Sequence, residues 1–110
     1  MTCSKLSGRV HGTVRLTSCS PRSKRYASAK VKPDGIVTWS TSSKVTVTFL
    51  PPATAVGRGT CARGRTEWDL AGAVTGGTAT NTAFGDSVFA RMCATPTGSV
   101  TLVPHSRFLL

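Results

Sequence analysis

Acidic residues are scarce in this chain of 110 residues, which contains 4 Asp and Glu against 14 Lys and Arg. The resulting formal net charge of +10 attracts anionic polymers whatever the fold. Nucleic acids, anionic lipid headgroups and acidic glycans of the cell wall or extracellular space are therefore candidate partners. The competing interpretation is that the charge serves solubility alone.

Long apolar runs and helical periodicity are missing as well. No segment approaches the roughly 18 consecutive apolar residues of a membrane-spanning helix, so we expect no transmembrane segment. Good helix formers never gather into a stripe with the i, i+3, i+4, i+7 spacing, so we expect almost no helix. The length predicts one domain over residues 1–110.

The pattern that is present is two-residue alternation, interrupted by clusters of Gly, Pro and Ser. It predicts an all-β fold, either an antiparallel β-sandwich or a small barrel of about seven to nine strands. Residues 8–17 alternate either as one long strand or as a hairpin with a three-residue loop, in which Val10 faces Val14. Pro33, Asp34 and Gly35 predict a tight turn. Further strands are predicted at residues 26–32, 36–40, 44–50, 66–75, 78–83, 87–94 and 99–103, with a short apolar edge at 107–110.

Cysteines are the residues best suited to stabilise so small a core, and we expect all four to form two disulfides: Cys3, Cys19, Cys61 and Cys93. There is no C-x-x-C pair and no histidine at zinc-ligand spacing, so we expect neither a metal site nor another cofactor. A hairpin at residues 8–17 would bring Cys3 near Cys19, which slightly favours Cys3–Cys19 with Cys61–Cys93 over the other two pairings. In an alternative interpretation, Cys3 begins a mature lipoprotein and carries lipid.

Disulfides persist in oxidising compartments, which predicts a secreted, extracellular or cell-envelope protein whose signal peptide has been removed. The spacing from Cys3 through Gly8 and Gly12 to Cys19, with residues 66–77 and 85–88, resembles that of small exported β-rich proteins of actinobacteria. The resemblance implies export and a β-rich fold, and it brings no catalytic motif or function to carry over.

Two basic segments are candidate binding sites for a polyanion. Residues 57–65 alternate glycine and arginine, which combines exposed backbone N–H groups with forked side-chain donors for phosphate or sulfate. The other segment, residues 22–32 with Lys30 and Lys32 among its cations, includes Tyr26, whose ring could stack on a base or a sugar. For both, the competing interpretation is an ordinary solvated loop. The candidate residues are Arg58, Arg63, Arg65, Arg22, Lys24, Arg25 and Tyr26.

Catalytic candidates are few. Glu67 and Asp69 fall on one face of a predicted strand, about 7 Å apart, a separation that suits paired carboxylates in glycoside or phosphodiester cleavage. Ion pairing with Arg or Lys on a neighbouring strand is the competing interpretation. No serine lies in a G-x-S-x-G motif, which leaves acyl transfer without support.

The sequence favours a secreted, non-catalytic binding module that engages an anionic partner through cationic loops. One alternative is a small nuclease or glycan hydrolase using Glu67 with His11 or His105. The other is a carrier of a hydrophobic ligand, if the strands close a barrel with an open mouth. Trp39 and Trp68 are expected in the core, although on an exposed sheet face they would form a sugar platform.

Overall fold

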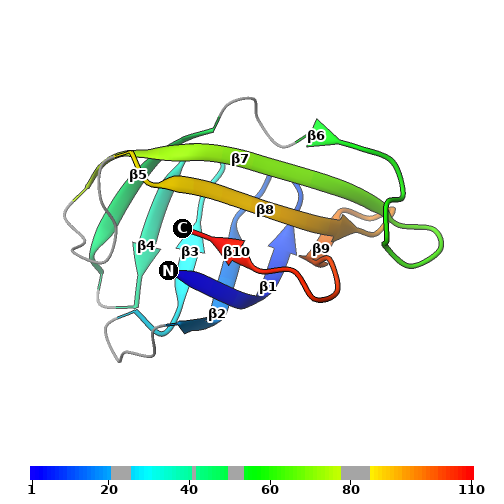
Figure 1. The fold of residues 1–110 in the computed structure, drawn as a ribbon, viewed down its shortest axis with the longest axis horizontal. Helices are drawn as coiled ribbons and strands as arrows, with labels where there is room; N and C mark the ends of the chain where they lie inside the picture. The colour runs from blue at the N-terminus through cyan, green and yellow to red at the C-terminus, as the bar shows by residue number, and fades with distance from the viewer. Residues whose placement is uncertain (21–25, 41, 50–53, 78–84) are drawn as a thin grey trace.

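A computed structural model of the chain describes residues 1–20, 26–40, 42–49, 54–77 and 85–110 (Figure 1). Within these ranges every regular element is a β-strand, and no helix exists that could cross a membrane. The predicted strand at residues 78–83 lies outside the described residues. The strands are β1 (Thr2–Arg9), β2 (Val14–Ser20), β3 (Ala29–Val31), β4 (Ile36–Trp39), β5 (Lys44–Phe49), β6 (Thr54–Ala55), β7 (Thr66–Gly77), β8 (Ser87–Ala94), β9 (Ser99–Leu102) and β10 (Phe108–Leu109).

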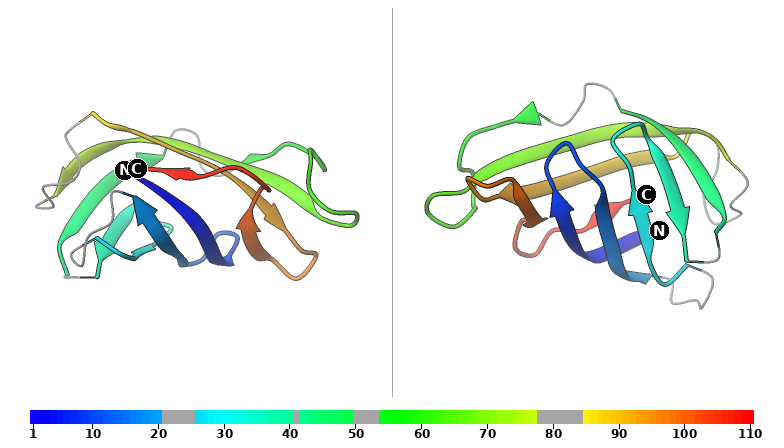
Figure 2. Two further views of the ribbon diagram at one scale, coloured as in Figure 1. Left: turned by 60° about the horizontal axis from the view of Figure 1, so that its bottom comes forward. Right: turned by 180° about the vertical axis from the view of Figure 1, so that it is seen from behind.

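The strands close into an antiparallel barrel of eight strands. Strands β1 to β5 pair in sequence order, β5 pairs with β7, and β7 pairs with β8 along most of its length. Strand β9 closes the wall because it pairs with both β8 and β1, and β10 bridges the same two strands near the other end of β1 (Figure 2). The predicted barrel is confirmed, and the predicted sandwich is not supported.

Alternating inward residues fill most of the barrel. The largest fully buried side chains are those of Trp39, Phe108 and Leu16. Burying an apolar side chain of this size stabilises the fold by about 1.5–3 kcal/mol. Trp39 is thus a core residue as predicted, and Trp68 is half-buried against the same core.

Both disulfides have the pairing that the sequence slightly favoured. Cys3 lies directly opposite Cys19 on the β1–β2 hairpin, and Cys61 is bonded to Cys93 on β8. The alternative of one long strand at residues 8–17 is wrong, because β1 ends at Arg9 and the chain turns back into β2. The expected register is also wrong, because Gly8 rather than Val10 lies opposite Val14. A lipid on Cys3 is also wrong, since its sulfur forms the bridge to Cys19. Two disulfides fit a protein of an oxidising compartment.

A second, smaller layer covers one end of β7 and β8 from outside the barrel. Residues 54–57 run along the edge of β7, with β6 pairing Thr54 opposite Asp69, and residues 58–65 cross the outer face toward Cys93. Cys61, Cys93 and Val103 form a buried cluster separate from the main core. The Cys61–Cys93 bridge therefore fastens this segment to the barrel wall.

Candidate functional site

A cavity of about 390 Å³ opens at one end of the barrel. Val14, at the start of β2, lies opposite Val31, at the end of β3, so the β1–β2 and β3–β4 turns lie at the same barrel end. Figure 2 shows the two turns at one end of the wall, seen from behind. The apolar lining of the cavity consists of Val10, Val14, Val31, Val47, Phe49, Leu70 and Met92.

The inward residues that β2, β3 and β5 contribute deepest at this barrel end are valines, which leaves space for the cavity. Val14, Val31 and Val47 are buried, yet their short side chains do not reach across the barrel. Farther along the same strands, the inward residues opposite Ala29 are Leu16 and Trp39, which close the interior there. The barrel is therefore filled in its middle and hollow at one end.

The predicted turn at residues 33–35 forms part of the rim. The backbone N–H of Gly35 donates to the carbonyl of Lys32 (3.0 Å), and Asp34 Oδ1 accepts from the backbone N–H of Ile36 (3.2 Å). The N–H of Val47 on β5 donates to the carbonyl of Gly35 (2.8 Å). Gly35 has φ +91°, and a Cβ there would overlap the carbonyl oxygen of Val47. Only glycine lets this turn lie so close to β5.

Polar side chains edge the opening. Arg9 Nη1 donates to the carbonyl of Thr97 in the β8–β9 turn (3.2 Å). The ring of His11 meets Trp68 edge-on, with centroids 5.0 Å apart. These contacts tie the tip of the β1–β2 hairpin to β7 and to the β8–β9 turn. The rim is also polar at Lys32 and Asp34.

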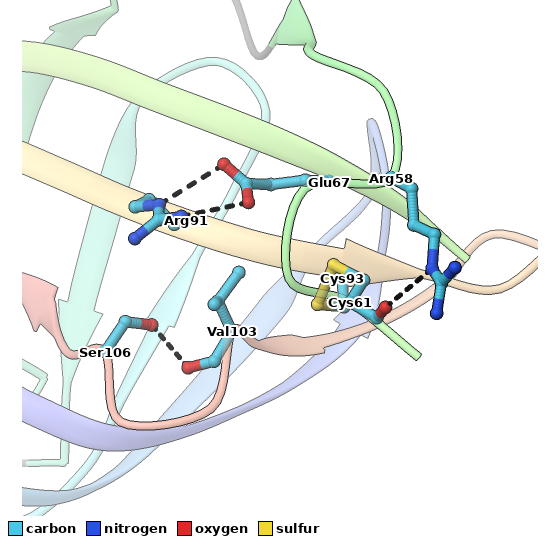
Figure 3. Close-up of a disulfide and its surroundings, with 7 residues drawn as sticks. All are labelled: Arg58, Cys61, Glu67, Arg91, Cys93, Val103 and Ser106. Atoms are coloured by element: carbon cyan, nitrogen blue, oxygen red, sulfur yellow. Dashed lines mark hydrogen bonds and ion pairs between the residues drawn. A yellow bond between two sulfur atoms is a disulfide. The ribbon is translucent and has the colours of Figure 1, made fainter. Parts of the chain in front are cut away.

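The acidic pair predicted on one strand face lies on the outer side of β7. Glu67 is buried under residues 57–64, and its Oε1 and Oε2 accept from Arg91 Nη2 (3.1 Å) and Nε (3.2 Å) (Figure 3). The hydrogen bonds from Arg91, with one from Asp69, hold the pKa of Glu67 below its ordinary value. Burial, followed by the neighbouring Glu67, raises the pKa of Asp69. A hydrogen bond between the two carboxyl groups contributes to both directions.

This arrangement is the ion pair with arginine that competed with a catalytic role. Both oxygens of Glu67 are occupied by Arg91, and a Cβ at Gly59 would overlap Oε1, so the covering loop leaves no room for a substrate. His11 lies at the barrel mouth against Trp68, and His105 lies in the β9–β10 loop, whereas the carboxylate of Glu67 is bound by Arg91. The proposed nuclease residues are therefore not brought together.

The predicted polyanion residues lie in different places. Arg58 and Arg63 are exposed and Arg65 is partly exposed beside the Cys61–Cys93 bridge, where Arg58 Nε donates to the carbonyl of Cys61 (3.2 Å; Figure 3). The ring of Tyr26 meets Trp39 edge-on at 5.3 Å and is partly buried against the core. Arg22, Lys24 and Arg25 lie outside the described residues. A polyanion site on these residues stays a prediction.

Comparisons of the chain with protein families, with curated proteins and with solved structures found no match. In the described part of the chain, no three His, Cys, Asp or Glu side chains are grouped as metal ligands would be. The cavity was not located by the sequence. The feature of the sequence that could have indicated it is the set of short inward residues Val14, Val31 and Val47 near the two turns.

Proposed function

We propose that this protein is a non-catalytic binding protein that holds a small apolar molecule in the open end of the barrel. The observation that carries the proposal is the apolar cavity of about 390 Å³ between the turns at residues 10–13 and 32–35. Small-molecule sites are typically concave, mostly apolar spaces of about 300–1,000 Å³ with a few polar groups at the edge. The cavity fits this description in size, lining and position at a barrel mouth.

The shape of the core limits the ligand. Trp39, Leu16 and Phe108 occupy the barrel beyond the cavity, so a long chain has no space to extend along the axis. A compact ring system or a short branched chain suits the space better. Such a ligand gains affinity mainly by burying apolar surface, at about 25 cal/mol per Å². For a ligand this small we expect a dissociation constant in the micromolar range.

The proposal can be tested with N-phenyl-1-naphthylamine, a fluorescent apolar probe. The probe is neutral, so the +10 charge of the protein does not attract it. Val10→Trp places a large ring at the mouth, where Val10 is only partly buried, and should weaken binding at least tenfold. Val56→Trp is the matched control, because Val56 is 51% exposed and is not part of the cavity lining.

We expect saturable fluorescence enhancement with the natural sequence and with Val56→Trp, and little with Val10→Trp. Equal binding by both variants would place the probe elsewhere and overturn the proposal. Absence of saturable binding by the natural sequence would do the same. Circular dichroism of each variant checks that the barrel is intact.

A further inference from the structure

The outer face of β2 to β5 carries a row of cations at right angles to the strands. Arg15 on β2 lies opposite Lys30 on β3, Lys30 lies opposite Thr38 on β4, and Thr38 lies opposite Lys44 on β5. The residues on either side of Arg15, Lys30 and Thr38 are more buried than they are, so the row points outward. Neighbouring strands are about 4.8 Å apart, so the row spans roughly 14 Å.

No carboxylate of the chain lies on these strands. The 4 acidic residues are Asp34, in the β3–β4 turn, Glu67 and Asp69, on β7, and Asp86, just before β8. Like charges directly opposite on neighbouring strands destabilise a sheet. The fold therefore tolerates a repulsion between Arg15 and Lys30, and an external anion bound between them would reduce it.

The surface around the row is hollowed and rich in hydroxyl groups. A depression of about 360 Å³ is lined by Arg15, Lys30 and Thr38 together with Ser28, Ala29, Trp39 and Ser40, of which Trp39 is almost fully buried. Other outward positions on β2 and β5 carry Thr17, Thr46 and Thr48, and in the described parts of β2 to β5 no aromatic side chain points outward. The face therefore offers cations and hydroxyls without a platform on which bases would stack.

We propose that this face, which we name the cationic row (Arg15, Lys30, Thr38 and Lys44), binds an extended anionic polysaccharide that crosses the strands. The linear arrangement suits a polymer with regularly spaced sulfate or carboxylate groups, and the hydroxyls suit the sugar oxygens. Because no aromatic ring points outward from the described parts of β2 to β5, single-stranded nucleic acid is disfavoured. Two disulfides fit a compartment outside the cytosol, where such polysaccharides occur.

The test uses a heparin-derived hexasaccharide and two variants of equal charge. One removes the cationic row with Arg15→Gln, Lys30→Gln and Lys44→Gln. The other removes the loop arginines with Arg58→Gln, Arg63→Gln and Arg65→Gln. Each lowers the formal net charge from +10 by three, to +7. Affinity is measured by isothermal titration calorimetry at several salt concentrations, and thermal melting shows that each variant is folded.

We expect the row variant to lose at least about tenfold in affinity and to reduce the slope of log affinity against log salt by about two to three. The loop variant should change affinity less than about threefold. Equal losses in both variants would mean that net charge alone attracts the polymer and would overturn the proposal. A larger loss in the loop variant, no binding by the natural sequence, or equally tight binding of a single-stranded oligonucleotide of the same charge would also overturn it.

Discussion

Arg15 and Lys30 are direct cross-strand partners on the exposed side of β2 and β3, so two cations face each other on the barrel wall. Lys30→Glu replaces this repulsion with an attraction and should raise the free energy of unfolding by about 0.5–1 kcal/mol in low salt. Urea denaturation measures the change. Lys30→Gln should give a smaller gain, and a loss of stability in Lys30→Glu would contradict the expected repulsion.

Glu67 on β7 is paired with Arg91 on the neighbouring strand β8. Glu67→Gln keeps the size of the side chain but removes the charged acceptor for the guanidinium, so we expect a loss of about 1–3 kcal/mol in unfolding free energy. A double-mutant cycle with Arg91→Met isolates the pair. Arg91→Met should be less damaging in the Glu67→Gln background than in the natural sequence. Additive effects would show that the pair contributes no coupling.

Asp69 and Glu67 are expected to affect the stability of the fold in opposite directions as pH changes. The raised pKa of Asp69 gives a contribution to stability that is full below its unfolded-state pKa and is lost as pH rises through the folded-state value. The lowered pKa of Glu67 gives a contribution present above its unfolded-state pKa and lost as pH falls through the folded-state value. As pH falls from neutral, protonation of Asp69 therefore first raises the stability of the fold, and protonation of Glu67 at lower pH then reduces it.

Asp69→Asn tests this order, because the amide can still donate to Glu67 but cannot ionise. The variant should melt at a higher temperature than the natural sequence at neutral pH, and the difference should shrink as pH falls to about 4, near the ordinary Asp pKa. Thermal melts across this range measure the difference. A constant difference at every pH would show that ionisation of Asp69 is not its cause.

Gly35 and Gly98 allow a matched test of the cavity rim. Both have nearly the same backbone conformation, with φ +91° and +92°, but a Cβ at Gly98 meets nothing within 4 Å whereas one at Gly35 overlaps the Val47 carbonyl. Gly98→Ala should lower the unfolding free energy by about 1 kcal/mol from backbone strain. Gly35→Ala should cost clearly more and should weaken probe binding in the cavity. Equal effects on stability would mean that Gly35 and Val47 can separate without penalty.

Much of the wall could be predicted from alternation. Val45, Val47 and Phe49 mark one side of β5, and the predicted strands at residues 36–40, 87–94 and 99–103 overlap β4, β8 and β9. The preferred disulfide pairing followed from the hairpin that places Cys3 opposite Cys19. Closure could not be predicted, because period-two alternation is the same in a sandwich and in a barrel.

The candidate sites were harder to predict because they depend on contacts distant in sequence. Alternation placed Glu67 on the outer face of its strand, but it could not indicate that residues 57–64, tied down at Cys61, would cover that face. The cationic row depends on the register of β2 with β3, which brings Arg15 opposite Lys30. The cavity depends on which inward side chains share one barrel end, and this too is set by register.

The most direct test of the central claim, a ligand cavity at the end of a closed barrel, is a backbone NMR titration with N-phenyl-1-naphthylamine. We predict saturable chemical-shift changes concentrated at Val10, Val14, Val31, Val47 and Met92, with little change at Arg58 and Arg63. No saturable change, or changes concentrated away from the turns at residues 10–13 and 32–35, would contradict the claim.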